Sequence, residues 1–581
     1  MVTLSNTSQT QRKGYGLVAG FVAAGLILIP VVLFWYVWST YAVSIPKWDD
    51  HVLRAFLLNF DKEASLSGKL YEFYRQHNEH RIVYDRIITW LDFNLFGKFS
   101  YRHLMLVGNL SLLGLIAIFG LVLGRSTVLQ GKNAQAQVSP SLTDYLVYLP
   151  PVAFLLLNLS QWENMFWGMA ALQNFTVLLW VFWTIYQLAF SNRLWPALVL
   201  ATAATLTSGN GLLVWPVGFA ILVLQQLLEK RPNRKAILIW SISAVVLIGL
   251  YFLNYQKPPG NPPARGSFFD LIKGWLAFSG AAAEAFPVGP AFAKCLLVGS
   301  IATVLALGSW VYLLEKGFVK KQFPAFSYFF FGTTAFLLGT AATVAWSRVG
   351  FGLHLLITSR YKIYSLLLLA LVYCFIIVQQ RKTGRLWVLV LGLVFSAGLM
   401  AGSYLTYLSD TLYWRHWLTT HQFNWTHNAN NATISIDSAS SHYTDLAPAF
   451  YDTTLPTIFG QPTQAAVPVQ LQKDSGGYLI QNSTLPAQGI GDEGPYLLAR
   501  SDVRSYLFPV RQNQQSVQAA RFLPANLFTN GFTANVPTEE MIAGSYQLFI
   551  LTIPDGRASL HPTNQTIESA GPPAATLKKN W

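Results

Sequence analysis

The chain has 581 residues, of which 52% are hydrophobic and only 11% are charged, and its mean hydropathy is +0.37. Soluble proteins carry about 25% charged residues, so this composition excludes an ordinary soluble protein and predicts a polytopic membrane protein. The formal net charge of +14 does not indicate nucleic acid as a partner, because the excess basic residues stand mainly in short connectors between apolar runs.

Apolar runs predict about eleven transmembrane helices, since a membrane-spanning helix needs about 20 predominantly apolar residues. The first run is too long for a signal peptide, whose apolar core has about 7–15 residues, and so predicts an uncleaved span. The runs cover residues 17–43, 103–124, 143–159, 169–190, 195–207, 211–228, 237–255, 293–314, 325–346, 362–379 and 386–408. The runs at 143–159 and 195–207 are short, which is typical of tilted, kinked or re-entrant segments.

Charges in the connectors predict the orientation. Basic residues gather in alternate connectors, at Arg12, Lys13, Arg125, Lys132, Arg193, Lys230, Arg231, Arg234, Lys235, Lys316, Lys320, Lys321, Arg381, Lys382 and Arg385. We expect the protein in the plasma or inner membrane. The positive-inside rule then places its N-terminus in the cytoplasm. The outside face holds the loops 45–99, 160–168, 208–211, 256–292 and 347–361 and the segment after residue 408.

The first outside loop, residues 45–99, is long and dense in ionisable groups. Apolar spacing predicts a short helix over 50–60 and a longer one over 68–96, both lying along the membrane interface. Trp48-Asp49-Asp50-His51 follows the first span directly, and ionisable groups at a membrane boundary are typically functional. Asp49 and Asp50 can serve as a general base or hold a divalent cation such as Mg²⁺ or Mn²⁺. The alternative for one of them is a helix N-cap.

A second group in this loop comprises His77, His80 and Arg81. Their spacing of i, i+3 and i+4 puts them on one face of the predicted helix, where such basic groups can bind a phosphate. In the alternative, Arg81 pairs with Asp85 and the histidines face lipid headgroups. A zinc site is disfavoured, because the loop offers no obvious third and fourth ligand.

Three later outside loops add candidates. Glu163, next to Trp162, is a carboxylate at the outer ends of two spans; its alternative is a solvated acid among interfacial tryptophans. Asn210 lies in the tight turn 208–211, where backbone amides can approach a ligand, although an ordinary hairpin explains the turn too. Arg360 and Lys362, on either side of Tyr361, put positive charge on the outer face, where topology does not require it. An anionic lipid phosphate would explain that charge, and snorkelling toward headgroups is the alternative.

The composition changes after residue 408. Residues 409–581 are rich in Asn, Thr, Ser, Gln, Pro and Gly, and short β-type runs at 478–480 and 546–551 are separated by turn sequences at 474–477 and 554–556. We therefore expect two domains, a transmembrane domain over 1–408 and a small, mostly β outer domain over 409–581. A loose tail is expected from about Pro562.

The layout resembles the membrane glycosyltransferases of the GT-C fold class. The resemblance rests on Trp48-Asp49-Asp50-His51 in a long outer loop with two juxtamembrane helices, on Glu163 as a second outer acid, and on an outer C-terminal domain after the last span. It implies an all-α GT-C-like membrane domain that transfers a sugar from a polyprenyl-phosphate donor to an acceptor outside the cytoplasm. The acceptor would be a cell-envelope glycan, a lipid or a protein.

The resemblance also implies roles for individual residues. Asp49 or Asp50 would be the general base, with Glu163 as a further catalytic acid, and a metal would be optional, because basic residues can serve a monophosphate donor. The donor phosphate would contact His77, His80, Arg81, Arg360 and Lys362. The substrates would contact Trp48, His51, Trp162, Asn210 and Tyr361.

Three other functions compete with sugar transfer. A transporter or flippase would need ionisable groups deep in the spans, and the apolar runs contain almost none. A lipid-linked glycan ligase of another fold would carry basic catalytic residues in a large late outer loop, whereas the acids here stand in the first. A non-catalytic scaffold would use the outer β domain to bind glycan or a protein partner.

Overall fold

A computed structural model describes residues 3–129, 140–229, 233–257, 266–426, 442–445 and 464–571. The chain divides into two compact units. The first, here the helical unit, comprises Met1–Thr40, Glu63–Ile88 and Leu104–Tyr404; the second, here the sandwich unit, comprises Tyr41–Lys62, Thr89–His103 and Leu405–Trp581. Parts of the first loop, residues 41–62 and 89–103, thus group with the segment that begins at Leu405.

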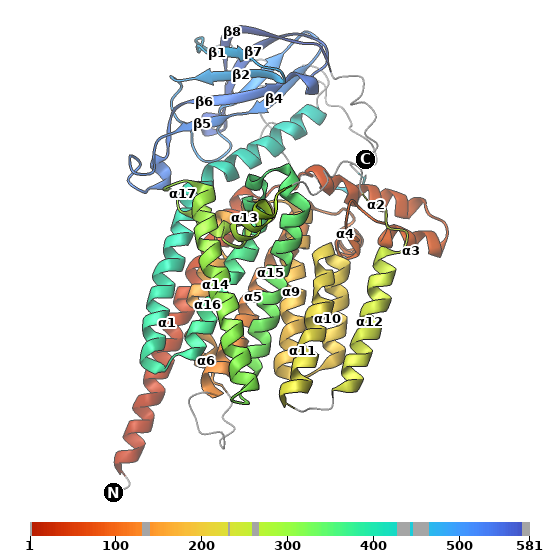
Figure 1. Ribbon diagram of the computed structural model, residues 1–581. Coiled ribbons are helices and arrows are strands. Elements are labelled where there is room, and N and C mark those ends of the chain that lie inside the picture. The colour runs from red at the N-terminus through yellow and green to blue at the C-terminus, as the bar shows by residue number, and fades with distance from the viewer. Residues whose placement is uncertain are drawn as a thin grey trace. The chain divides into compact units, whose positions relative to one another are not determined.

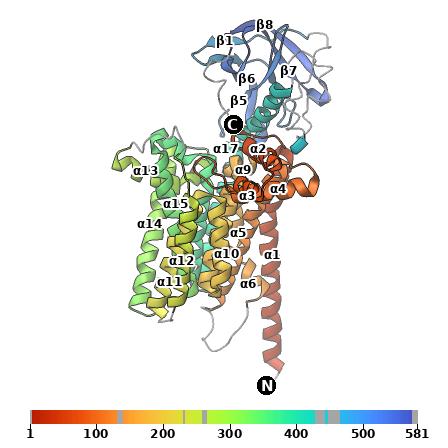
Figure 2. The same cartoon turned by 90° about the vertical axis from the view of Figure 1, so that its right-hand side faces the viewer.

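Four helices run from one unit into the other: α1 (Thr3–Tyr41), α4 (Val83–Phe96), α5 (Tyr101–Leu129) and α17 (Lys382–Thr426). The helical unit also holds α3 (Leu66–Tyr74), α6 (Leu142–Leu146), α7 (Pro150–Leu156), η2 (Leu159–Gln161), α8 (Trp162–Met165), α9 (Gly168–Tyr186), η3 (Gln187–Ser191), α10 (Leu194–Thr207), η4 (Gly209–Leu213), α11 (Val214–Glu229), α12 (Arg234–Phe252), α13 (Phe268–Ser279), η5 (Ala281–Ala285), α14 (Ala291–Phe318), α15 (Ala325–Arg348), η6 (Val349–Phe351), η7 (Leu353–Ile357), η8 (Ser359–Tyr361) and α16 (Lys362–Gln379). Its long helices lie side by side in Figures 1 and 2.

Nine helices in the described part of the chain are long and apolar enough to cross a membrane, and α10 is a shorter apolar helix. The chain is therefore a multi-pass membrane protein, but the eleven predicted spans are not all found. The run at 143–159 folds as two short helices, α6 and α7, followed by η2. Pro150 and Pro151 begin α7, because proline lacks the N–H that would continue a preceding helix. All seven residues of α7 are buried, so this apolar run is protein core.

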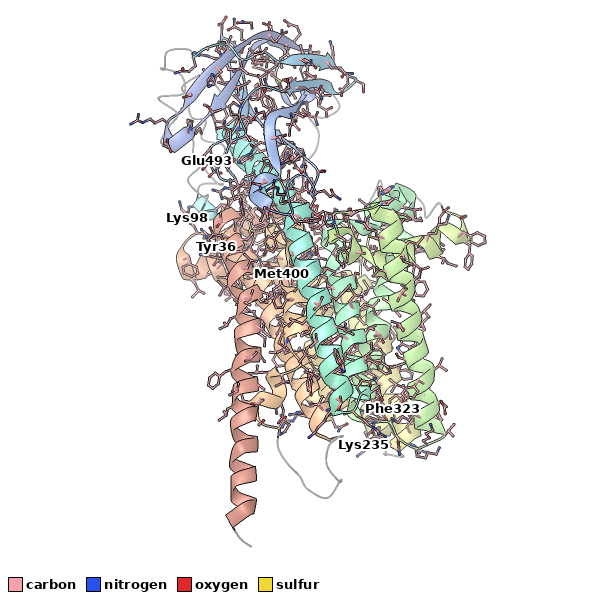
Figure 3. All side chains as sticks on the ribbon, turned by 90° about the vertical axis from the view of Figure 1, so that its left-hand side faces the viewer. Tyr36, Lys98, Lys235, Phe323, Met400 and Glu493 are labelled. Atoms are coloured by element: carbon pink, nitrogen blue, oxygen red, sulfur yellow. The ribbon has the colours of Figure 1, made fainter. Side chains whose placement is uncertain are left out.

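One end of the helical unit holds the start of α12 and the basic segment just before α15 (Figure 3). Figure 3 shows Lys235, at the start of α12, and Phe323, just before α15, near the same end. α12 has 19 residues, so at 1.5 Å per residue its other terminus lies roughly 28 Å away. Tyr251, near the end of α12, therefore belongs to the second end. α15 runs from the first end to the second, so α16, which follows it, starts at the second end. We call it the Lys362 end, after the first residue of α16.

One of the two helices predicted in the first loop is confirmed. α2 (His51–Lys62) covers the predicted 50–60 helix. The longer helix predicted over 68–96 is wrong, because it is split into α3 and α4. Between them, His77 and His80 exchange backbone hydrogen bonds of 2.9 Å, and Asn78 adopts a left-handed φ of 46°. Asn tolerates that conformation better than most residues, and the turn removes the shared helical face proposed for His77, His80 and Arg81.

The C-terminal region is sheet-rich, as predicted. Its strands are β1 (Gln470–Lys473), β2 (Gly477–Asn482), β3 (Tyr496–Arg500), β4 (Ser505–Pro509), β5 (Arg511–Gln514), β6 (Phe528–Pro537), β7 (Gly544–Thr552) and β8 (Ser559–Ser569), with η1 (Trp48–Asp50), η9 (Pro524–Asn526), η10 (Thr538–Glu540) and η11 (Pro554–Gly556) as short 3₁₀ turns of this unit. They form two antiparallel sheets in the orders β1-β2-β6-β5 and β4-β3-β7-β8. The predicted runs at 478–480 and 546–551 lie in β2 and β7. The loose tail was predicted to begin at about Pro562, which is wrong, because Pro562 lies inside β8 and pairs with Phe549 of β7.

Strand β3 is buried on both faces. Leu497 joins the core between the two sheets, which contains residues of both, such as Ile480 and Ile550. Leu498 points to the opposite face and packs with Phe423 near the end of α17. The helix thus covers a sheet face that would be solvated in an isolated sandwich, which explains why β3 is continuously apolar instead of alternating.

We expect Leu498→Ala to destabilise the sandwich unit by about 2–5 kcal/mol, the usual cost of truncating a buried leucine. Hydrogen exchange of the β3 and β7 amides in the full-length protein would measure the loss. The control is Gln481→Ala, at an exposed position in β2. Equal protection in the two variants would contradict the packing of α17 on this face.

Candidate functional site

Glu163 and Arg360 form a pair at the Lys362 end of the helical unit. Arg360 Nε lies 3.9 Å from Glu163 Oε2, and the backbone N–H of Arg360 donates to the same oxygen over 3.2 Å. The backbone N–H of Glu163 in turn donates to Ser359 Oγ over 3.1 Å. These contacts join α8 to η8. The Arg360 side chain is 32% exposed, so an anionic ligand can reach its guanidinium.

Lys362, the first residue of α16, is paired with Glu284 of η5 by a short ion pair. The Lys362 side chain is only 1% exposed and that of Glu284 is 26% exposed. A buried ammonium is costly without an opposite charge, which explains why a carboxylate stands beside it. The positive charge predicted here is therefore already compensated, and Arg360 is the more accessible cation of the two.

A ring network connects Tyr361 with the 208–211 turn. Asn210 Nδ2 donates to Tyr364 Oη over 2.7 Å, and the Phe278 ring lies 5.2 Å from Tyr361 and 5.5 Å from Tyr364. The predicted substrate residues Asn210 and Tyr361 thus belong to one aromatic cluster of the helical unit. Trp162 begins α8, next to Glu163, and is partly exposed.

The turn between α3 and α4 contacts the same region. His80 Nδ1 accepts a hydrogen bond from the Gly209 N–H over 3.2 Å, so this nitrogen carries no proton in that arrangement. Glu79 beside it forms a short ion pair with Arg348, at the end of α15. His77 contacts the side chain of its neighbour Asn78 at 3.3 Å. Of the two histidines, the structure thus brings His80 close to Asn210.

Arg81 has a structural role that differs from the predicted phosphate binding. Its Nε, Nη1 and Nη2 donate to the backbone carbonyls of Tyr251, Tyr74 and Leu253 over 3.1, 3.0 and 2.5 Å. Two of these carbonyls belong to the C-terminal end of α12, where a cation is favourable. Arg81 is 4% exposed and three of its five donors are engaged, so we assign it to holding the loop on α12.

The acidic pair of the first loop lies in the sandwich unit, and the structure distinguishes its two members. Asp50 is fully buried, and its Oδ2 accepts the backbone N–H of Lys47 over 3.1 Å. In that contact Asp50, the third residue of η1, caps the backbone N–H of Lys47, which is the N-cap residue, so Asp50 is not itself the N-cap expected for one of the two aspartates. Asp49 is partly exposed. An acceptor could therefore reach the Asp49 carboxylate but not the Asp50 carboxylate.

Trp48 precedes this pair in a strained conformation. Its φ of 44° is left-handed, which costs a bulky residue roughly 1–2 kcal/mol. The Lys47 ammonium lies 4.0 Å from the Trp48 ring and 3.7 and 3.4 Å from the rings of Trp414 and Trp417 on α17. These cation–π contacts hold η1 against α17 and offset the strain. Strained residues that are held in this way are typical of functional sites.

His51, the first residue of α2, is neutral at pH 7. Burial, reinforced by the positive charge of Arg54, lowers the pKa of His51 to about 4. A neutral imidazole cannot attract a phosphate by charge, but it can donate or accept a hydrogen bond. His51 is therefore a hydrogen-bonding group and not a cation at pH 7, and its contact with a substrate stays a prediction.

The same pKa predicts a pH dependence of stability. Unfolded histidine has a pKa of about 6.5, so its contribution to stability is complete above that value and falls as the pH drops toward 4, because only the unfolded state gains the proton. With allowance for screening, we expect α2 to lose roughly 1 kcal/mol between pH 7 and pH 5. Hydrogen exchange of α2 measures this loss, which His51→Gln should reduce. The matched variant His561→Gln, in β8, controls for loss of an imidazole, and an unchanged slope in His51→Gln would contradict the prediction.

Several contact residues were not predicted from the sequence: Lys47, Glu79, Glu284, Arg348, Trp414 and Trp417. Glu284 had a usable signal, since it is a single acid among alanines in a predicted outer loop. Within the described ranges, no three His, Cys, Asp or Glu side chains come together to hold a metal ion.

Comparisons of the chain with protein-family models, with curated proteins and with solved structures return no match.

Proposed function

We propose that the chain is a membrane glycosyltransferase that moves a sugar from a polyprenyl-phosphate donor to an extracytoplasmic glycan, lipid or protein. The observation that carries the proposal is the Glu163–Arg360 pair at the start of the candidate membrane span Ser359–Gln379, which comprises η8 and α16. A guanidinium at a membrane boundary suits the phosphate of a lipid whose tail lies in the bilayer. Its planar fork of donors can bind two phosphate oxygens at once.

In the proposed reaction, the hydroxyl oxygen of the acceptor attacks the anomeric carbon of the sugar. The bond between that carbon and the phosphate oxygen breaks, and its electron pair leaves with the polyprenyl phosphate. The resemblance assigns the base that takes the proton of the hydroxyl group to the acidic pair, of which the Asp49 carboxylate is accessible and the Asp50 carboxylate is buried. Arg360 stabilises the charge that develops on the departing phosphate.

The supporting residues fit this division of roles. Glu163 holds the backbone and side chain of Arg360, and Lys362 with Glu284 anchors the start of α16 two residues further on. Asn210 and Tyr361 offer an amide and an aromatic ring for a sugar. In the orientation that we propose, the basic connectors near Lys235 face the cytoplasm and the Lys362 end faces outward.

The test uses membranes that contain the full-length chain and polyprenyl phosphates carrying a radiolabelled sugar. We expect label to enter cell-envelope material at a rate that Arg360→Met lowers by about 10²-fold, the usual effect of removing one donor to a developing charge. Arg381→Met, in a basic connector, is the matched control. Equal label with and without the chain would refute the proposal.

A further inference from the structure

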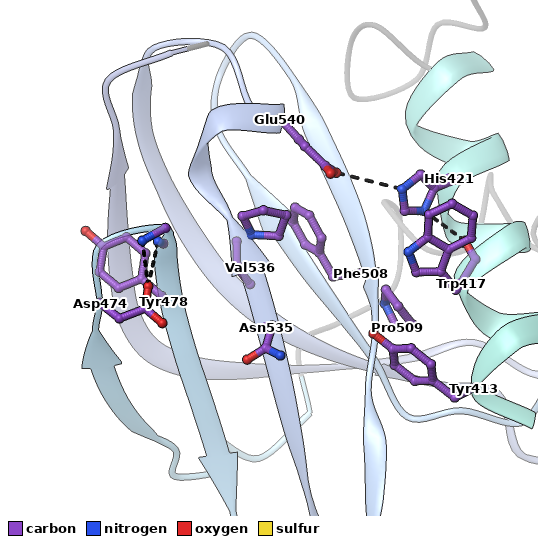
Figure 4. Close-up of a pocket in the computed structure, with 13 residues that line it drawn as sticks. Tyr413, Trp417, His421, Asp474, Tyr478, Phe508, Pro509, Asn535, Val536 and Glu540 are labelled. Carbon is purple, nitrogen blue, oxygen red and sulfur yellow. Dashed lines mark hydrogen bonds and ion pairs between the residues drawn. The ribbon is translucent and has the colours of Figure 1, made fainter. Parts of the chain in front are cut away.

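A pocket of about 290 Å³ lies in the sandwich unit, between one face of α17 and the sandwich. The helix contributes Tyr413, Trp417 and His421, whose spacing of four residues places them on one face. The sandwich contributes Asp474, Tyr478, Phe508, Asn535 and Glu540. Figure 4 shows Trp417 and His421 on the helix side and Asp474 and Asn535 on the strand side.

The lining combines aromatic rings with an amide and two carboxylates. None of the described residues that line the pocket is lysine or arginine, so the pocket does not attract a phosphate or another anion. Carboxylate oxygens accept hydrogen bonds, and the Asn535 amide both donates and accepts. Sugar hydroxyls need both kinds of partner, and the C–H faces of a sugar ring pack well on aromatic side chains.

A cationic ligand would suit aromatic rings and carboxylates as well, but here the protein supplies the cations itself. The Arg511 guanidinium lies 3.9 Å from the Tyr413 ring, and the Lys47 ammonium lies 3.4 Å from the Trp417 ring. A ring that already attracts a cation on one face attracts a second one less strongly.

The carboxylates are also engaged. Asp474 Oδ1 accepts the N–H groups of Gly476 and Gly477 over 2.8 and 2.9 Å. Glu540 Oε2 lies 3.8 Å from His421 Nε2, a contact that is an ion pair only when the imidazole is protonated. The pocket therefore provides oriented hydrogen-bond acceptors whose negative charge disfavours an anion, while a guanidinium and an ammonium group of the protein already face two of its rings. Together these features favour a neutral ligand that is rich in hydroxyl groups.

We propose that this pocket binds a neutral saccharide. Its volume is near the lower limit of small-molecule sites, about 300–1,000 Å³, so it would hold one or two sugar rings at the end or side of a longer glycan. The proposal does not depend on sugar transfer, because neither Asp49 nor Arg360 lines the pocket. It gives the chain a second carbohydrate site, at which an envelope glycan is held without being cleaved or extended.

The test measures binding of the fluorescently labelled full-length protein, in nanodiscs and without any lipid-linked donor, to an array of neutral and acidic oligosaccharides. We expect wild type to bind at least one neutral glycan and Asn535→Ala to bind it about 10-fold more weakly, the effect of losing one or two hydrogen bonds. Asn530→Ala, at an exposed position of the same strand β6, is the matched control and should bind like wild type.

Two further comparisons complete the design. Asp49→Asn should bind the glycan like wild type even if it abolishes transfer, which separates this proposal from the proposed function. Wild type that binds no neutral glycan, or binds one as tightly as Asn535→Ala does, would overturn the proposal. Binding of choline in place of any saccharide would also overturn it, because the pocket would then be a cation site.

Discussion

Asp49→Asn is expected to lower the rate of sugar transfer by about 10²–10⁴-fold, the usual contribution of a general base. Asparagine keeps the size of the side chain but cannot accept the proton of the acceptor hydroxyl. Because Asp49 is partly exposed, the substitution should leave the fold of the sandwich unit unchanged. Transfer of radiolabelled sugar in membranes, at matched amounts of protein, measures the effect.

Asp50→Asn provides the contrast, because the two neighbours have different surroundings. The Asp50 carboxylate is buried and accepts the N–H of Lys47 over 3.1 Å. Its replacement puts an amide into that site and should cost about 1–3 kcal/mol of stability, with transfer retained by the protein that is still folded. If Asp50→Asn abolished transfer without unfolding and Asp49→Asn did not, the assignment of the base to Asp49 would be wrong.

Much of the helical architecture could be predicted, because hydropathy over a window of about 20 residues reports directly on membrane spans. The run at 143–159 shows the limit of that argument. It is apolar because α7 is buried in protein, and hydropathy cannot distinguish a buried core segment from a lipid-facing one. Pro150 and Pro151 were visible in the sequence and mark where the helix is interrupted.

The turn at His77–Arg81 shows a second limit. Apolar spacing on both sides predicted one helix over 68–96, but the interruption depends on Asn78 in a left-handed conformation and on Arg81 reaching the carbonyls of α12. The left-handed turn could be suspected from the asparagine itself. The hydrogen bond from Arg81 to Tyr251 joins residues 170 positions apart, and no local pattern in one sequence reveals such a contact.

The site residues divide in the same way. Asp49, Glu163, Arg360 and Lys362 stood out because charge at the end of an apolar run is unusual. Their partners did not, since the contact of Lys362 with Glu284 spans 78 positions and that of Lys47 with Trp417 spans 370. The sequence therefore indicated which charges matter, but not how they are paired or buried. Both cations have a carboxylate partner, and burial separates Lys362, 1% exposed, from Arg360, 32% exposed.

Glu284→Gln is expected to destabilise the helical unit by about 3–5 kcal/mol, the usual cost of removing one partner of a buried ion pair. The glutamine would leave the Lys362 ammonium, 1% exposed, without its paired charge. Lys362→Met should cost less, because Glu284 is 26% exposed and water can solvate its carboxylate. Unfolding of the full-length protein in nanodiscs, followed by hydrogen exchange of α16, measures both losses.

The double variant Lys362→Met/Glu284→Gln decides whether the pair or the space it fills matters. Because both charges are then absent, we expect most of the stability lost in Glu284→Gln to return. The pair Lys320–Glu315 is the matched control: its atoms are 3.7 Å apart but its side chains are more than half exposed, so removing it should cost at most about 1 kcal/mol. If the double variant were as unstable as Glu284→Gln, charge compensation would not explain this pair. If it regained stability but not transfer, the Lys362 charge would serve the reaction as well as the fold.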